Sequence, residues 1–157
     1  MRGQLAFTGL ILCTLLVTST ASAAERIAWE TDLDTAWDAA VAEQKPLLIF
    51  ITRDNCKFCT KMKKSTLIDQ RVVGYVGTQF VPLIVNSKAE QRLVRDLKIT
   101  SFPTTVVIAT DKTVVQRIKG HVTARDFEMR LAEAEQRAAN LEQRAIASSR
   151  RASSRTR

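Results

Sequence analysis

The feature that most constrains the fold is a continuous apolar run that leads directly into a pair of cysteines. The run "LLIFIT" occupies 47–52, and Cys56 and Cys59 follow it three positions apart. A run without polar alternation is typical of a strand that is buried on both faces. Such a strand needs covering layers above and below it, so the sequence predicts an α/β architecture with the cysteines at the end of a core strand.

The flanking segments predict the other elements of this architecture. "FVPLIVN" at 80–86 is a second apolar strand with Pro82 near its start, and Asp111-Lys112 joins two further strands as an antiparallel hairpin. Helices are predicted over 32–44, from the cysteines to about Leu67, over 69–76 and 88–97, and from a capping box of Thr123 and Asp126 onward. Helices between the early strands imply parallel pairing there, so we predict a mixed central β-sheet flanked by helices, with an extended C-terminal helix.

The N-terminus has the pattern of a cleavable export signal. Arg2 precedes an apolar run from Leu5 to Val17, and the small residues 21–23 come before a predicted cleavage site at Ala24. The apolar run is too short to cross a hydrocarbon core of roughly 30 Å as a helix. We therefore predict a signal peptide over 1–23 and a periplasmic or otherwise exported mature chain, in which only two of the three cysteines remain.

Two cysteines at this spacing suit a redox pair, a static disulfide or two metal ligands. A static bridge over two intervening residues closes a very short loop and so constrains the unfolded chain little. A metal site needs more ligands than this sequence offers, because His121 is the only histidine and no second CxxC motif exists. The redox interpretation is therefore favoured, with no metal and no organic cofactor, since the cysteines themselves carry the electrons.

The surroundings of the pair predict which cysteine attacks. Cys56 stands where a strand gives way to a helix, so the N-terminus of that helix stabilises a thiolate there, and the neighbouring cation of Lys57 does the same. Cys59 lies one turn further into the helix and is positioned to resolve a mixed disulfide. We predict Cys56 as the nucleophile, Cys59 as the resolving thiol and Lys57 as a thiolate-stabilising residue.

These motifs resemble the thioredoxin superfamily over roughly 29–134. A buried strand, a CxxC motif that opens a helix and the later step Phe102-Pro103-Thr104 are the matching features. The resemblance implies a thioredoxin fold in which Pro103 is a cis-proline beside the dithiol and belongs to the catalytic site. It also implies that the Phe102 backbone receives a substrate strand, and that Gly120 lies on the far side of the same groove.

The chain is more specifically similar to exported thioredoxin-like domains, such as the C-terminal domain of periplasmic thiol:disulfide interchange reductases. That resemblance implies a thiol:disulfide oxidoreductase of the protein-disulfide reductase type, whose partners are proteins with disulfides or thiols and a membrane redox partner that recycles it. Three features depart from the family pattern: Asn55 replaces a tryptophan, Phe50 replaces a buried acid, and Lys57-Phe58 replaces Gly-Pro. A cation at position 57 favours the thiolate and so argues for a more oxidising pair.

His121 follows Gly120 directly, which raises the question of a proton carrier near the dithiol. A lone histidine in such a loop is more often simply exposed, and that is the interpretation we favour.

The C-terminal region exceeds what the fold requires. We predict a thioredoxin-like domain over 24–135, an extension of the last helix over 136–147 and a disordered Arg/Ser-rich tail over 148–157. The apolar stripe of the extension consists largely of alanine, so a monomer is expected, with at most weak association through this helix. No nucleic-acid partner is expected, because no aromatic residues interleave with the arginines. The alternative function is a redox-idle binding module that recruits a partner through this helix and the basic tail.

Overall fold

The computed structural model describes residues 26–155 and contains one central sheet. Four strands form it in the order β2-β1-β3-β4. Their bounds are Leu47–Thr52 for β1, Val81–Asn86 for β2, Thr104–Ile108 for β3 and Val114–Lys119 for β4. β1 pairs in parallel with β2 and antiparallel with β3, and β3 pairs antiparallel with β4. The predicted signal peptide, 1–23, lies outside the described residues.

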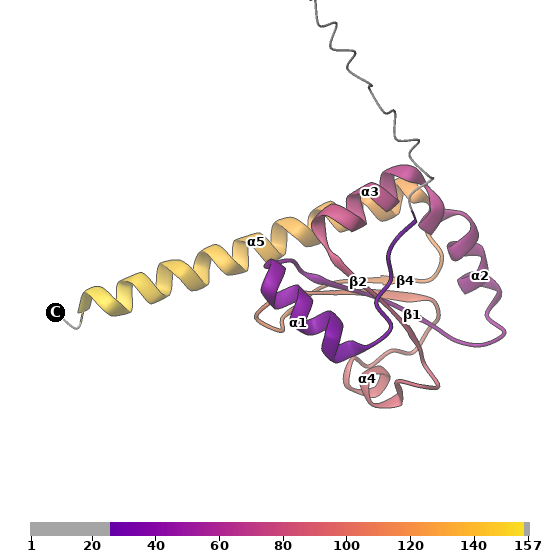
Figure 1. Ribbon diagram of the computed structural model, residues 1–157, viewed down its shortest axis with the longest axis horizontal. Coiled ribbons are helices and arrows are strands. Elements are labelled where there is room, and N and C mark those ends of the chain that lie inside the picture. Colours follow the sequence, from indigo (N-terminus) through magenta and orange to yellow (C-terminus); the bar gives the residue numbers. More distant parts are fainter. Residues whose placement is uncertain (1–25, 156–157) are drawn as a thin grey trace, which may run out of the picture.

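Helices cover both faces of this sheet, as Figure 1 shows. They are α1 (Leu33–Glu43), α2 (Lys57–Lys64), the short 3-10 helix η1 (Thr66–Ile68), α3 (Gln70–Gln79), α4 (Gln91–Asp96) and α5 (Ala124–Arg155). α2, α3 and α5 pack on the face that carries Leu48 and Phe50, whereas α1 packs on the face that carries Ile49 and Ile51. Every residue of β1 is buried, so the predicted α/β architecture is confirmed.

The helix boundaries follow from local capping. The Asp32 carboxylate accepts a hydrogen bond from the Thr35 amide at the start of α1. Thr123 and Asp126 form one half of the predicted capping box of α5: the Asp126 amide donates to the Thr123 hydroxyl at 3.2 Å, and that hydroxyl, rather than the Thr123 amide, donates to the Asp126 carboxylate at 2.8 Å. Helix α1 begins at Leu33, so Trp29 lies before it and contacts Phe50 instead, with 6.0 Å between the ring centroids.

The segment before α1 adds one contact that the sequence pattern did not predict. Glu30 forms an isolated parallel bridge with Leu83 at the free edge of β2. The Glu30 amide donates to the Pro82 carbonyl at 2.8 Å, and the Ile84 amide donates to the Glu30 carbonyl at 2.9 Å. Pro82, which has no amide proton, is accommodated because β2 is an edge strand.

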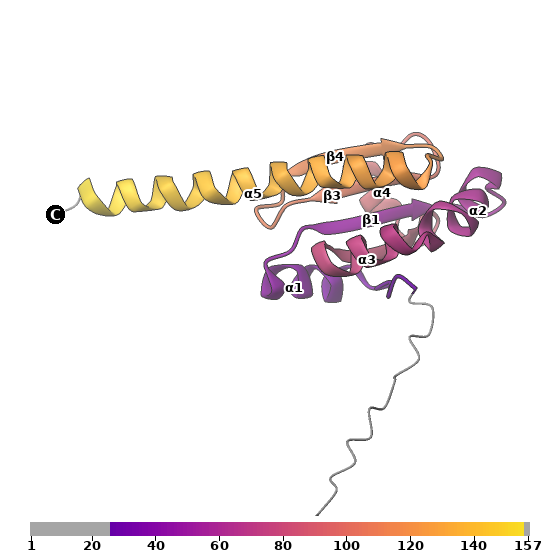
Figure 2. The same ribbon diagram turned by 90° about the horizontal axis from the view of Figure 1, so that it is seen from above.

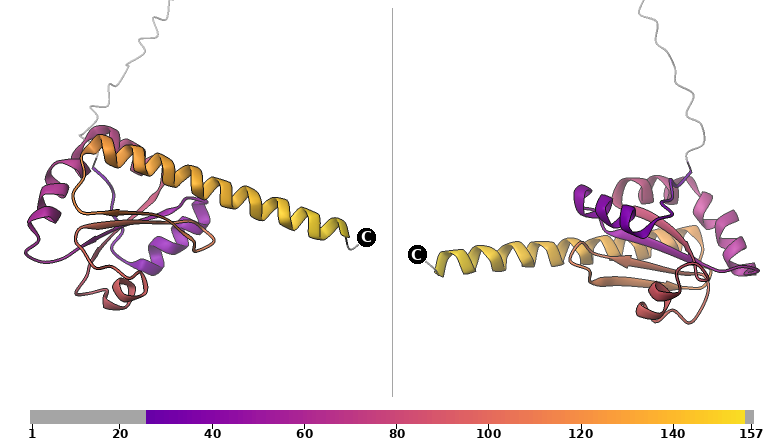
Figure 3. Two further views of the ribbon diagram at one scale, coloured as in Figure 1. Left: turned by 180° about the vertical axis from the view of Figure 1, so that it is seen from behind. Right: turned by 60° about the horizontal axis from the view of Figure 1, so that its bottom comes forward.

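Helix α5 extends well past the sheet (Figures 2 and 3). Its buried stripe ends at Ala138, and the helix continues to Arg155. Residues 148–155 are therefore helical where the sequence predicted a disordered tail. The segment contains neither proline nor glycine, and arginine and alanine are strong helix formers, so nothing stops a helix that is already nucleated by the docked turns. Among the residues described, no helix has the length and apolar character to cross a membrane.

Candidate active site

The cysteine pair lies where β1 ends and α2 begins. β1 ends at Thr52, a turn over 53–55 follows, and Cys56 is the N-cap residue of α2 in an extended conformation. Asn55 has a φ of 53°, in the left-handed region that asparagine tolerates better than most residues. This turn directs the chain from the sheet into the helix and places both sulfur atoms at the end of the buried strand.

Cys56 and Cys59 form a disulfide bond, with 5.2 Å between their Cα atoms. The Cys59 amide donates a hydrogen bond to the Cys56 sulfur at 3.1 Å. Cys56 is 9% exposed and Cys59 is 2% exposed, so the first cysteine is the more accessible one. The same amide and the N-terminus of α2 point at the Cys56 sulfur, where they stabilise negative charge on that atom in the reduced form.

The charges beside Cys56 are mostly positive. Lys57 is exposed at the first position of α2. The acid nearest in sequence, Asp54, accepts a hydrogen bond from the Asn86 amide group at 2.7 Å and lies 3.7 Å from the Lys88 ammonium. Asp54 is thus engaged with Asn86, the last residue of β2, and with Lys88 just after it. The sequence around Asp54 gives no sign of this neutralisation, because both partners lie more than thirty positions away along the chain.

The loop before β3 lies against the same end of the sheet. The Phe102–Pro103 peptide bond is cis, and Thr104 pairs with Ile51 in the sheet, so the loop stands beside the end of β1. The Arg53 guanidinium carbon lies 5.4 Å from the centroid of the Phe102 ring. Within residues 26–155, neither the amide nor the carbonyl of Phe102 has a hydrogen-bond partner. The backbone of Phe102 is therefore available to an incoming chain.

Gly120 belongs to the same loop cluster. Its amide donates to the Pro103 carbonyl at 2.8 Å, and its φ of 76° favours glycine. A Cβ atom built there would meet no other atom within 4 Å, so the backbone conformation is what favours glycine. The structure thereby brings Cys56, Cys59, Phe102, Pro103 and Gly120 to one end of the sheet.

His121 contacts the opposite end of α2 from the dithiol. Its Nε2 atom lies 3.3 Å from the Ser65 hydroxyl, which donates to the Lys61 carbonyl at 2.8 Å. Ser65 is nine residues beyond Cys56, which corresponds to about 13 Å along a helix. His121 thus joins the end of α2 to the loop before α5 and makes no contact with the cysteines.

The strands beneath the dithiol carry a buried hydroxyl group next to the apolar side chain of Phe50. Phe50 is fully buried and pairs directly with Thr105 in the neighbouring strand. The Thr105 hydroxyl is buried and has no hydrogen-bond partner in the part of the chain that the structure describes. The only hint in the sequence is a threonine at an inward position of "TTVVI".

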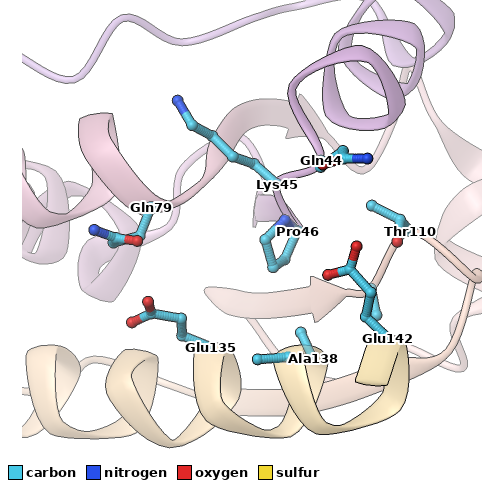
Figure 4. A pocket seen from close by; sticks show the side chains of 10 residues that line it. Gln44, Lys45, Pro46, Gln79, Thr110, Glu135, Ala138 and Glu142 are labelled. Atoms are coloured by element: carbon cyan, nitrogen blue, oxygen red, sulfur yellow. The ribbon is translucent and has the colours of Figure 1, made fainter. Parts of the chain in front are cut away.

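A separate pocket lies at the other end of β1. Figure 4 shows it between Pro46 and the side chains of Glu135, Ala138 and Glu142 on α5. β1 has six residues, so this pocket is about 20 Å from the dithiol and does not belong to the same site. In the described chain, no group of three or more side chains of the types that bind metals comes together.

The fold and the site define a class of protein. A mixed four-stranded sheet between helical layers, with a CxxC motif at the start of a helix and a cis-proline loop beside it, is a thioredoxin fold. The family model of the thioredoxin-like domain matches residues 33–135. The chain belongs to the thioredoxin-like domain family, which confirms the superfamily that the sequence predicted.

Solved structures agree with this assignment. The DsbH oxidoreductase is 20% identical with a TM-score of 0.62, and the match covers 76% of this chain and 92% of that one. A thioredoxin from Thermus thermophilus is 23% identical with a TM-score of 0.61, covering 73% and 87%. The C-terminal domain of DsbD from Neisseria meningitidis is 25% identical with a TM-score of 0.55, covering 64% and 93%. No curated protein matches the chain by sequence. The thioredoxin-like fold with its Cys56–Cys59 pair supports a thiol:disulfide oxidoreductase.

Proposed function

We propose that the protein is an exported protein-disulfide reductase in which Cys56 is the nucleophile and Cys59 the resolving thiol. The observation that carries this proposal is the position of the Cys56 sulfur. It is the more exposed of the two, it accepts the Cys59 amide at the N-terminus of α2, and it lies at the end of the sheet that holds the cis Phe102–Pro103 loop. An attacking thiolate needs both this stabilisation and this access.

The reaction consists of two exchanges. The Cys56 thiolate attacks one sulfur of a substrate disulfide, forms a mixed disulfide and releases the other substrate sulfur as a thiolate, which takes up a proton. Cys59 then loses its proton, and its sulfur attacks the Cys56 sulfur, which forms the Cys56–Cys59 disulfide and releases the second substrate thiolate. The substrate gains two electrons and two protons, and the protein loses them.

The cis-proline loop positions the substrate in this scheme. The unpaired amide and carbonyl of Phe102 bind the substrate backbone in an extended conformation, as at the edge of a sheet. Pro103 shapes the loop beside the sulfur atoms, and Gly120 supports it through the hydrogen bond to the Pro103 carbonyl. Lys57 stabilises the Cys56 thiolate by its charge.

The reducing direction rests on the resemblance to interchange-reductase domains, and the reduction potential tests it. The protein is equilibrated with glutathione or dithiothreitol buffers, and its free thiols are read by alkylation. A potential near roughly −270 mV, as in thioredoxin, supports the reductase. A potential near roughly −120 mV would make the protein a disulfide donor and overturn the proposed direction.

Two variants test the roles of the cysteines. Cys56→Ser is expected to abolish disulfide exchange, whereas Cys59→Ser is expected to accumulate a mixed disulfide that reducing agents release. Full activity of the Cys56→Ser protein would contradict the mechanism.

Export and recycling are part of the same proposal. The signal pattern over 1–23 supports secretion, and oxidised Cys56–Cys59 outside the cytosol needs a membrane redox partner for its return to the dithiol form. Cell fractionation with N-terminal sequencing tests this. A chain that begins at Ala24 in the periplasm is expected, and an uncleaved cytosolic chain would refute it.

The part of α5 after Ala138, called the projecting half of α5 below, favours one alternative, a binding module whose dithiol is idle. Removal of 143–157 would then destroy function in the cell, and replacement of both cysteines would not. The reductase predicts the opposite pattern.

A further inference from the structure

The outward face of α2 carries a row of lysines that starts beside the attacking sulfur. Lys57, Lys61 and Lys64 are spaced by four and three residues, and all three are exposed. Cys59 and Met62 on the opposite face are buried, so the lysines share the solvent side of the helix. From the first to the last of them the helix rises about 10 Å.

No acidic side chain neutralises this row within the described residues. None of the three lysines forms an ion pair there, and the nearby Asp54 is held by Asn86 at the end of β2 and by Lys88 in the turn that follows. Arg53, on the other side of Cys56, is exposed and lies over the Phe102 ring. The solvent side of α2 beside the dithiol is therefore cationic, and its lysines have no acidic partner among the residues that the structure describes.

An exposed aromatic side chain interrupts the same surface. Phe58 lies between the two cysteines in sequence, and 59% of it is exposed. Aromatic side chains are enriched in protein interfaces, where the ring supplies apolar contact, and charged side chains at the polar rim steer and orient the partner.

We propose that this surface, Lys57, Lys61 and Lys64 with Phe58, selects protein substrates whose disulfide lies beside an acidic segment. The proposal rests on the proposed function, because it names the substrate class of that same dithiol. Carboxylates on the substrate meet the lysines as the substrate sulfur reaches Cys56, which raises the rate of encounter more than the final affinity. A lipid surface is the weaker candidate, since the partner of a dithiol must present sulfur at this same place.

Matched disulfide peptides test the proposal. Two peptides carry the same cystine and differ only in four flanking residues, which are Glu in one and Lys in the other. The rate at which each oxidises the reduced protein is measured at low salt and in 0.5 M NaCl. At low salt the acidic peptide is expected to react about 10-fold faster, within the range of electrostatic steering, and salt is expected to reduce the preference to near unity.

Variants of α2 test whether its lysines cause the faster reaction with the acidic peptide. The double variant Lys61→Gln with Lys64→Gln is expected to lose most of it while still reacting with the basic peptide. Lys63→Gln is the control on the same helix, because Lys63 lies on another side of α2, where it lines a pocket together with Trp29 and Leu67. Arg144→Gln with Arg150→Gln removes two charges from the part of α5 at the other end of the molecule (Figure 2). An equal loss in the controls, or equal rates for the two peptides, would overturn the proposal.

A binding measurement separates this proposal from the proposed function. The disulfide form of the protein is mixed with a labelled Glu-rich peptide that has no cysteine, and binding is followed by fluorescence anisotropy at low salt. If binding depends on Lys61 and Lys64 but no peptide exchanges its disulfide, the proposed binding surface is supported and the proposed reductase activity is refuted. If both peptides exchange at the same rate and the Glu-rich peptide does not bind, the reductase activity is supported and the binding surface is refuted. Binding to phosphatidylglycerol vesicles and not to the peptide would overturn the protein partner in favour of a membrane.

Discussion

The two adjacent threonines of β3 are expected to respond oppositely to the same substitution. Both are almost fully buried, but the Thr104 hydroxyl donates to the Ser101 carbonyl at 2.7 Å, whereas the Thr105 hydroxyl has no partner within the described residues. Valine has nearly the shape of threonine and suits a strand equally well. Thr104→Val and Thr105→Val therefore remove the same group from two neighbouring sites that differ in hydrogen bonding.

The expected magnitudes follow from that difference. Thr104→Val removes the partly buried hydrogen bond to the Ser101 carbonyl, which costs about 0.5–1.5 kcal/mol of unfolding free energy. Thr105→Val removes a buried hydroxyl that lost its hydrogen bonds to water on folding and gained none in the described part of the protein. Its removal should therefore stabilise the protein by about 1–3 kcal/mol. The two variants should thus differ by roughly 1.5–4.5 kcal/mol, although they change adjacent residues in the same way.

Urea denaturation of the disulfide form measures this difference. The fluorescence of Trp29 and Trp37 reports unfolding, and with a slope of about 2 kcal/mol/M the midpoints of the two variants should lie roughly 1–2 M apart. A Thr105→Val protein that is less stable than the wild type by 1 kcal/mol or more would refute the reasoning. It would mean that the Thr105 hydroxyl is bonded in solution.

Two further predictions concern the packing of α5. Burial raises the pKa of Tyr75 above its ordinary value, as does the hydrogen bond that its hydroxyl donates to the Glu135 carboxylate. This contribution to stability is complete below about pH 10 and is lost as the pH rises through the raised pKa. Tyr75 is the only tyrosine, so a pH titration followed by absorbance at 295 nm reports its ionisation alone. The titration midpoint of the wild type should lie well above pH 10 and should be lower in Glu135→Gln. A wild-type midpoint near pH 10 would contradict the raised pKa. Phe127→Ala, at a fully buried position, should cost about 3–5 kcal/mol in the urea assay, whereas Ile146→Ala, 48% exposed, should stay within about 0.5 kcal/mol. Similar losses in both would show that the projecting part of α5 is packed in solution.

The order and type of the elements were predictable because their signals are local. The apolar runs at 47–52 and 80–86 and the hairpin residues Asp111 and Lys112 lie where the structure has β1, β2 and the β3–β4 turn. The capping box of Thr123 and Asp126 marks the start of α5 within one residue.

Contacts between distant segments were not predictable in the same way. The bridge of Glu30 with Leu83 and the pairing of Asp54 with Lys88 join residues that are separated by more than thirty positions, and neither has a pattern in its own neighbourhood. The unpartnered hydroxyl of Thr105 depends on what lies around it in three dimensions. At the site, composition and spacing identified the two cysteines and Pro103. The net charge around them could not be predicted, because it depends on the pairing of Asp54 with Lys88, which only the fold brings together.

The division of α5 into two halves connects the fold to the site. Phe127, Leu131 and Ala134 pack in the same core cluster as Phe50 and as Met62 of α2, so the first turns of α5 support the helix that carries the dithiol. The family match ends at residue 135 and burial ends at Ala138, one turn later. Among the described residues, Ala134 is the last of α5 in this core cluster, and the helix then points away from the dithiol end of the sheet (Figure 2). Changes in the projecting half should therefore leave the redox chemistry intact, whereas a change at Phe127 or Leu131 alters the layer on which α2 rests.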